Sequence, residues 1–558
     1  MKFKDMPYER AEIEEIRKEH AAIEAAFDAA ESGEEQFEVH KRYYELSDKI
    51  GTAFNIAMIR HDGDMTDPFY EKESDYYNEI LPEVSNMMVH YQNKLYTSRF
   101  RPYLEEKIGP VAFKNMELAA KSVSEEILPL MQEENKLQDE YNKLLATAKI
   151  DWKGETLNLS LMQPYMTSAS REERVEAWKK YSQFFADNKE RMDDIYDKLV
   201  KNRTSQGIKM GHQDYLPLGY ARMQRNCYGR SDLQSFREQV KKDFVPFAEK
   251  LHELRRKRLG LAKLHFEDEG VYFTNGNPAP VGTPEEILEN GRKMYNELSP
   301  ETGEFMNFMC DNDLFDILGR KTKKTGGYMT YIPQYKSPFI FANFNGTSDD
   351  IDVITHECGH AFQGFVIRDD EIREHADITM ETAETHSMSM EFFTEPWMKN
   401  FFGDRSADYV RMHFEDSCLF IPYGTMVDEF QDIIYSNPGL NPKQRDEVWR
   451  DLERQYKPHL DYSGNALYEG GAFWQNKHHI YDSPLYYIDY CIAGTDALQY
   501  KVWMDRDYKA AWKSYLQLCK LSATDFFDVL VEKSGLNNPF EDGCLRDVVK
   551  KLEESMKL

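Results

Sequence analysis

The stretch His356-Glu357-Cys358-Gly359-His360 constrains this chain more than any other, because it follows the pattern H-E-x-x-H. Histidines four residues apart lie on one face of a helix, so both rings can reach a single metal ion. Glu357 leaves the helix at a different angle and can contact a water on that ion without being a ligand. The pattern therefore predicts a helix that holds a metal ion beside a catalytic base. The alternative is an ordinary helix that carries two histidines by chance.

The residues around the motif predict two successive helices. Thr347 and Asp350 form a capping pattern, and the acidic first turn suits the helix dipole. We expect one helix over residues 349–367, a polar loop over 368–377 and a second helix from about Thr379. Cys358 is interpreted as a small packed residue and not as a ligand.

A catalytic zinc site needs a third protein ligand and an open position. The continuation H-x-x-G-x-x-H is absent, since Gln363 and Val366 occupy those positions. The third ligand must then come from the loop or helix that follows. The candidates are Glu381, Glu384 and His386, with His375 and Asp377 as weaker ones, and composition alone does not choose among them.

Residues 326–345 are the most β-like part of the chain and predict two strands broken at Pro333 and Pro338. Proline confines a strand to the edge or the end of a sheet. An edge strand beside an active site can pair with the extended backbone of a peptide. A purely structural hairpin is the alternative.

Elsewhere the spacing of apolar residues predicts helices, and no fixed-period repeat is present. Leu157, Leu159 and Leu161 alternate after the Lys153-Gly154 turn, which predicts a small hairpin. A short strand is expected over residues 271–274. Capping patterns predict helix starts after Ser170 and Thr283.

Composition and charge exclude several classes of protein. With 70 basic and 98 acidic residues the net charge is −28, which disfavours nucleic acid and anionic membranes as partners. No apolar run approaches the roughly 18 residues of a membrane span, and the first residues lack the apolar region of a secretory signal. Seven scattered cysteines without a C-x-x-C pair argue against a disulfide framework. We therefore expect a cytoplasmic protein of several lobes.

On these motifs the chain resembles the thimet oligopeptidase and oligoendopeptidase F family of zinc metallopeptidases, and it is closest to the bacterial oligoendopeptidase F-like members. The family pattern is H-E-x-G-H followed by E-x-x-S-x-x-x-E, which matches His356–His360 and Glu384–Glu391. The resemblance implies one zinc ion per chain, held by His356, His360 and Glu384. It also implies that Glu391 orients a ligand, and it leaves Glu381 as a solvated helix residue.

The resemblance extends to two further stretches. His479 matches a family histidine followed by tyrosines, and Tyr486 and Tyr490 are expected to donate hydrogen bonds to an oxyanion. For Tyr481 and Tyr487 in the same stretch, a place in an aromatic core is the alternative. A third stretch, Gly326, Gly327 and Tyr328, resembles the substrate-binding strand of the family.

The resemblance implies a mainly α fold: a two-lobed helical ellipsoid with a deep central substrate channel and a small β-sheet near the zinc helix. Residues 1–165 would form an N-terminal helical lobe and residues 166–558 the zinc peptidase region. The implied function is a zinc-dependent endopeptidase that hydrolyses short oligopeptides through a metal-bound water, with Glu357 as the base. A carboxypeptidase or dipeptidyl carboxypeptidase is one alternative, and a non-catalytic peptide-binding protein is another.

Overall fold

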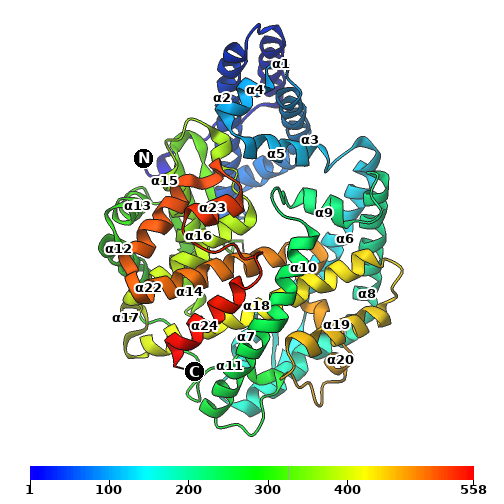
Figure 1. Cartoon of the computed structure of the whole chain (residues 1–558), viewed down its shortest axis with the longest axis vertical. Helices are drawn as coiled ribbons and strands as arrows, with labels where there is room; N and C mark the ends of the chain where they lie inside the picture. The colour runs from blue at the N-terminus through cyan, green and yellow to red at the C-terminus, as the bar shows by residue number, and fades with distance from the viewer. Residues whose placement is uncertain (325, 558) are drawn as a thin grey trace. The chain divides into compact units, whose positions relative to one another are not determined.

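The computed structural model describes residues 1–324 and 326–557, and these are mostly helical, as predicted (Figure 1). The chain divides into two compact units. The first unit comprises residues 1–120, 279–406 and 503–536, and the second comprises residues 121–278, 407–502 and 537–558. This division differs from the one expected at residue 165, because the N-terminal helices pack with the segment that carries the motif.

The first unit contains helices from three parts of the chain and one sheet. Its main elements are α1 (Ile13–Ala29), α2 (Gly33–Gly63), α3 (Pro68–Tyr96), α4 (Arg101–Ile108), α5 (Pro110–Ala120), α12 (Pro284–Leu298), α13 (Pro300–Asp311), β3 (Phe315–Leu318), β4 (Tyr328–Ile332), β5 (Ser337–Phe344), α14 (Asp349–Asp352), α15 (Cys358–Val366), α16 (Met380–Phe393), α17 (Lys399–Phe402) and α23 (Phe527–Lys533).

The N-terminal helices form because their apolar residues recur at helical spacing. In α1 the residues Ile16, Ile23 and Phe27 are buried on one face and pack against α2 and α3. Ser32 caps α2 by accepting a hydrogen bond from the Glu35 N–H group, at 3.1 Å. Asp67 caps α3 in the same way. The buried residues of these helices form one hydrophobic core within the first unit.

The sheet of the first unit has the strand order β3-β5-β4, so that β4 lies at an edge. β5 pairs in parallel with β3 and antiparallel with β4, and its residues from Ser337 to Ala342 are buried. The break expected at Pro333 is confirmed, since residues 333–335 form a 3-10 turn. The break expected at Pro338 is wrong, because Pro338 lies within β5 opposite Tyr331. A strand tolerates proline where its missing N–H group is not needed for pairing.

The second unit contains a small hairpin and long helices. Its main elements are α6 (Leu128–Ala146), β1 (Ile150–Trp152), β2 (Glu155–Leu157), α7 (Leu159–Met166), α8 (Arg171–Lys209), α9 (Leu216–Arg222), α10 (Arg230–Gln239), α11 (Val245–Arg258), α18 (Ser406–Ser436), α19 (Pro442–Tyr456), α20 (Ala466–Glu469), α21 (His478–Asp482) and α24 (Cys544–Met556). The long helix α22 (Tyr487–Leu521) begins in this unit, and the chain passes into the first unit at Trp503.

The local predictions for the second unit hold in part. β1 and β2 form the expected hairpin around Lys153 and Gly154, both with positive φ. Leu159 and Leu161 are not in the strand, because the Asn158 side chain caps α7 at that point. The starts expected after Ser170 and Thr283 are confirmed, the latter in the first unit.

The strand expected over residues 271–274 is wrong. The Tyr272 N–H group donates to the Asn277 side chain at 2.9 Å, and that side chain in turn donates to the Gly270 carbonyl at 2.8 Å. A side chain therefore satisfies backbone groups that a neighbouring strand would otherwise pair. Within the described residues, no helix combines the length and apolar character that crossing a membrane requires.

Candidate functional site

The H-E-x-x-H motif lies on a continuous helical stretch from Asp349 to Val366, close to the range predicted for it. The start of the helix differs from the prediction. Asp350 accepts hydrogen bonds from the N–H groups of Asn345 and Gly346, each at 2.8 Å, while the Thr347 hydroxyl donates to the Asn345 side chain. The acidic residue thus closes the loop before the helix, and Thr347 does not cap it.

The first half of the motif is π-helical, over residues Val353–Glu357, and α15 begins at Cys358. Such segments are rare and cluster at functional sites. The Tyr295 hydroxyl donates to the Ile354 carbonyl at 2.8 Å, and the Thr355 hydroxyl donates to the Ile351 carbonyl at 2.9 Å. These bonds stabilise carbonyl groups in the part of the helix where the regular ladder is interrupted. Cys358 is fully buried, as expected.

The helix α16 packs directly against α15 through a glycine. A Cβ atom at Gly359 would lie 2.7 Å from the Ser387 Cα atom and 3.1 Å from the His386 carbonyl oxygen. Any larger residue at position 359 would therefore push the two backbones apart. The glycine of H-E-x-G-H and the serine of E-x-x-S bring Glu384 within reach of the histidines.

His356, His360 and Glu384 come together as predicted from the family pattern. Glu384 Oε2 lies 3.4 Å from His356 Nε2 and 3.8 Å from His360 Nε2. One donor atom from each residue lies within 4.8 Å of the other two. The rings of the two histidines are nearly perpendicular, at 83°, with centroids 5.0 Å apart. Two imidazoles and a carboxylate are a donor set that suits zinc.

The groups behind these side chains fix their orientation. Glu391 Oε1 lies 2.6 Å from His356 Nδ1, so the outer nitrogen of the ring is held while Nε2 faces Glu384. The Ser387 hydroxyl donates to the Glu384 carboxylate at 3.2 Å. Carboxylates behind histidine ligands are a common feature of metal sites, where they fix the tautomer and the ring position.

The two histidines differ in their affinity for a proton. Burial opposes protonation of His356, but hydrogen bonds to Glu384 and Glu391 outweigh it and hold the pKa of His356 well above its usual value. Burial, followed by the charge on His356, lowers the pKa of His360 to about 4. A cation bound at this site would compete with the proton on His356, because histidine coordinates metals as a neutral ring.

Glu357 lies on the motif helix, close to the edge strand β4. Its carboxylate accepts a backbone hydrogen bond from Met329 in β4. Burial raises the pKa of Glu357; the nearby charge on His356 opposes that shift without cancelling it. A carboxylate with a raised pKa is suited to accept and release a proton near neutral pH.

The other candidates for a third ligand, Asp377 among them, do not join the two motif histidines. Glu381 is 1% exposed and accepts a hydrogen bond from the Thr379 hydroxyl, so the expectation that it is solvated is wrong. His386 is buried, and burial lowers its pKa to about 3. His375 Nδ1 pairs with Asp370 at 2.9 Å. Among the described residues considered for the third position, only Glu384 meets both motif histidines.

A cavity of about 360 Å³ opens beside His360. Met329 and Tyr331 of β4 line it together with Gly364 of α15, Ile372 and Ile378. Sequence reasoning did not find this cavity, because its walls come from segments brought together only by folding. The sequence feature that points to the cavity is Gly364, which follows His360 by four residues and lies on the same face of the helix.

The stretch compared with a substrate-binding strand lies at the start of β4. The Tyr328 hydroxyl donates to Asp62 at 2.9 Å, and its ring stacks on Phe341. Gly326 has a φ of +91°, and a Cβ atom at Gly327 would lie 3.1 Å from the Phe341 carbonyl oxygen. These contacts explain the two glycines structurally, and a role of the three residues in binding substrate stays a prediction.

The remaining predicted residues, His479, Tyr486 and Tyr490, belong to the second unit and gather there. The ring centroids of Tyr486 and Tyr490 are 4.9 Å apart, and His479 lies 6.1 Å and 6.4 Å from them. Burial, followed by the charge on His478, lowers the pKa of His479 to about 4. Tyr481 is fully buried and stacks on Tyr141, as expected for a core residue.

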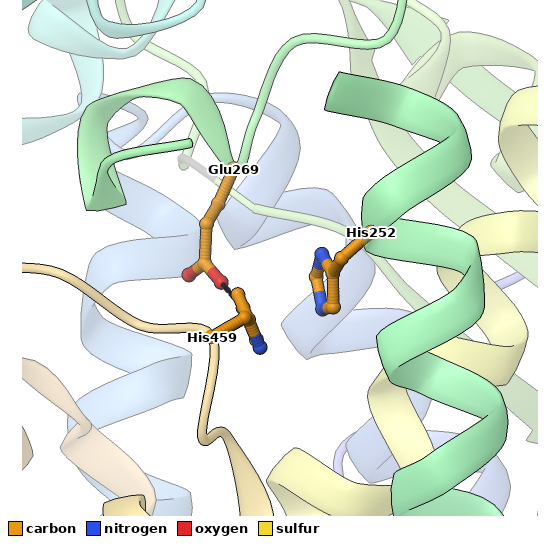
Figure 2. A group of neighbouring side chains, drawn as sticks. All are labelled: His252, Glu269 and His459. Carbon is orange, nitrogen blue, oxygen red and sulfur yellow. Dashed lines mark hydrogen bonds and ion pairs between the residues drawn. The ribbon is translucent and has the colours of Figure 1, made fainter. Parts of the chain in front are cut away.

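A second cluster with metal-ligand chemistry lies in the second unit, formed by His252, Glu269 and His459 (Figure 2). Here both nitrogens of His459 already face carboxylates, Nδ1 toward Glu249 at 3.2 Å and Nε2 toward Glu269 at 2.8 Å. The Lys457 ammonium pairs with Glu269 at 2.8 Å. The rings of His252 and His459 are stacked, with centroids 3.5 Å apart. A metal ion would have to displace a cation and unstack these rings, so the motif cluster fits a metal better.

Comparison with known proteins places these features in context. The model described as Peptidase M3 N-terminal domain matches residues 3–123, and the model described as Peptidase family M3 matches residues 303–549. The solved structure of Pz peptidase A with inhibitor 2 is 44% identical in sequence, covers 100% of this chain and 99% of that chain, and superposes with a TM-score of 0.92.

Two further proteins are also similar to this chain. A structure from Bacillus anthracis str. Ames, provisionally named oligoendopeptidase F, is 42% identical, covers 100% of this chain and 98% of that chain, and has a TM-score of 0.88. Oligopeptidase PepF of Bacillus subtilis (strain 168) is 22% identical over 328 residues, which are 56% of this chain and 47% of the relative. The match to PepF therefore spans about half of the length of that protein.

Proposed function

Because the chain belongs to peptidase family M3, in its oligoendopeptidase F group, we propose that it is a zinc-dependent endopeptidase that hydrolyses internal bonds of short oligopeptides. The observation that carries the proposal is the convergence of His356, His360 and Glu384 next to Glu357, which contacts an edge strand. Oligopeptides in the cytoplasm are the proposed substrates.

The residues present fit a zinc ion. Three donor atoms lie close together, the outer nitrogen of His356 is held by Glu391, and Glu384 is held by Ser387. Zinc bound to His356, His360 and Glu384 would polarise the scissile carbonyl and lower the pKa of a water toward 7. Cobalt or manganese could bind the same donors.

Glu357 is the proposed general base, and its raised pKa supports that role. Its carboxylate takes a proton from the attacking water and later delivers a proton to the leaving amine. Burial raises the pKa of the carboxyl, which makes the carboxylate a stronger base toward the attacking water. A backbone hydrogen bond from Met329 in β4 opposes this rise in pKa without cancelling it.

The edge strand β4 offers backbone groups to pair with an extended peptide, apart from the Tyr331 carbonyl, which accepts a hydrogen bond from the Asn55 side chain at 2.7 Å. Backbone pairing holds a peptide in an extended conformation and does not depend on its side chains. The assignment of His479, Tyr486 and Tyr490 to the oxyanion rests on the family resemblance and stays a prediction, as does the expected channel.

The charges around the cavity favour an endopeptidase over a carboxypeptidase. An enzyme that recognises a free terminal carboxylate needs a basic group to hold it. The three basic side chains in the described lining of the cavity are all paired: Arg368 with Glu304 at 2.9 Å, Arg373 with Asp48 at 3.1 Å, and Lys336 with Asp369 at 2.7 Å.

Mass-spectrometric mapping of cleavage sites in a mixed peptide library tests the proposal. We expect internal cleavage that continues when the peptides carry a C-terminal amide and stops with a chelator. Glu357→Gln should retain the metal and lose about a thousandfold in rate, within the range for one general base. Dependence on a free carboxylate would instead favour the carboxypeptidase. Bound metal with near-normal turnover in the variant would remove Glu357 from its role.

A further inference from the structure

We propose that Gly364 determines specificity: by having no side chain, it keeps open a pocket for a large apolar side chain next to the cleaved bond. This inference rests on the proposed function and names the substrate residue that the same site selects. The pocket is the cavity of about 360 Å³ beside His360, at the lower end of the size range of small-molecule sites.

The backbone conformation at position 364 does not require a glycine. It lies inside α15, and its φ is not in the left-handed region. A Cβ atom there would meet only the Tyr331 ring, at 3.7 and 3.9 Å, which is ordinary van der Waals contact. Gly359 in the same helix is different, because a Cβ atom there would lie 2.7 Å from a backbone atom of α16.

A glycine inside a helix costs roughly 0.5–1 kcal/mol relative to alanine. Close packing against α16 requires a glycine at position 359. No such contact requires a glycine at position 364. A side chain at position 364 would take up space in the cavity, because Gly364 forms part of its wall. The position follows His360 by four residues, so its side chain would project on the same face of the helix as that histidine.

The cavity also adjoins the edge strand in a way that suits a peptide side chain. Met329 and Tyr331 are two residues apart in β4, so their side chains point to the same side of the strand, and both line the cavity. A peptide lying along β4 would direct one of its side chains toward that wall.

The chemistry of the lining indicates which side chain fits. Ile367, Ile372 and Ile378 contribute apolar surface, and Tyr331 contributes an aromatic ring. The charged residues of the lining form ion pairs, such as Arg373 with Asp48. A phenylalanine or leucine side chain would bury apolar area there, while a charged one would lose hydration without gaining a free partner.

The test compares wild type with Gly364→Ala and Gly364→Leu on two series of blocked peptides that carry Phe, Leu, Ala or Gly on either side of one bond. At one of the two positions, wild type should prefer Phe and Leu. Gly364→Leu should lower kcat/KM for these peptides at least tenfold and leave the Ala and Gly peptides within about twofold, given the 10–200-fold value of small changes in an apolar pocket. Gly364→Ala should give a smaller shift in the same direction.

Gly439→Leu is the matched control, because Gly439 is exposed in the second unit with nothing within 4 Å of an added Cβ atom. It should cleave all peptides as wild type does. Gly364→Ala should also raise the melting temperature, which shows that the glycine is not required for folding. An equal loss on all peptides, or a drop in stability with Gly364→Ala, would overturn the proposal.

A binding measurement separates this proposal from the proposed function. Acetyl-phenylalanine amide and acetyl-alanine amide are titrated by NMR into wild type and Gly364→Leu. Stronger binding of the phenylalanine compound to wild type, lost in the variant, supports the pocket even if no peptide is cleaved. Equal binding of the compound to both proteins contradicts it even if cleavage is observed.

Discussion

Among the residues that the structure describes, two clusters contain the same residue types, two histidines and a glutamate, but their side chains are arranged differently. In the motif cluster the histidines come from one helix, their rings are nearly perpendicular, and Glu391 holds the outer nitrogen of His356. In the second cluster the rings of His252 and His459 are stacked.

The difference lies in the partners of the donor atoms. Both nitrogens of His459 face carboxylates, and Lys457 already supplies the positive charge that Glu269 requires. In the motif cluster both Nε2 atoms face one carboxylate oxygen. Residue type therefore does not identify a metal site; the direction of the nitrogens and the absence of a competing cation do.

The largest effect should come from removing the carboxylate of the motif cluster. Glu384→Ala is expected to lose the metal and all measurable peptidase activity, because two histidines alone hold zinc weakly. Metal content is measured by mass spectrometry of the dialysed protein. Glu381→Ala and Glu269→Ala serve as controls and should keep the metal. Loss of metal in Glu381→Ala with retention in Glu384→Ala would mean that the third ligand is misassigned.

A smaller effect is expected from the group behind the ligand. Glu391→Gln keeps a hydrogen-bonding side chain but removes the charge opposite His356 Nδ1, and we expect a 10–100-fold weaker affinity for zinc. Competition with a chromophoric chelator measures it. Glu249→Gln, the analogous change beside His459, should leave the affinity unchanged; an equal loss in both variants would erase the distinction between the clusters.

The close approach of α15 and α16 gives the next prediction. Gly359→Ala places a methyl group 2.7 Å from the Ser387 Cα atom, and the helices must shift to accept it. We expect a loss of about 1–3 kcal/mol in unfolding free energy, the usual range for overpacking. Urea denaturation measures the loss. A stability at or above that of wild type would show that the helices do not need this contact.

The smallest effect concerns the pH dependence of the second cluster. Burial, followed by the charge on His459, holds the pKa of His252 well below 6.5. A depressed pKa means that stability is complete above pH 6.5 and is lost as the pH falls toward the folded value, since the unfolded chain then binds the proton more readily. The loss is about 1.4 kcal/mol per pH unit.

Replacing His252 tests this assignment. His252→Phe should show a smaller fall in urea stability between pH 7 and pH 5.5 than wild type, whatever its stability at pH 7. His478→Phe, which changes an exposed histidine of the same unit, should keep the wild-type slope. If His252→Phe also keeps that slope, the ring is protonated in the folded protein, and the contrast between the clusters is weaker.

The sequence by itself determined the parts of the site that are local. The motif helix and the α16 helix follow from local spacing, where neighbours in space are three or four residues apart, while the pair Glu384 and Glu391 follows from the family pattern. The mainly helical fold follows in the same way from the period of apolar residues. Sequence alone left Glu381 and Glu384 as alternatives, and the family pattern was needed to choose.

Only the tertiary structure decided the rest. The burial of Glu381, the contact between Met329 and Glu357 and the cavity beside His360 join segments whose approach no local pattern specifies. The same holds for the difference between two glycines of one helix: a Cβ atom at Gly359 would clash with a neighbouring backbone, whereas one at Gly364 would make only ordinary contact with the Tyr331 ring. A sequence records which residue is present, and only the folded chain shows what surrounds it.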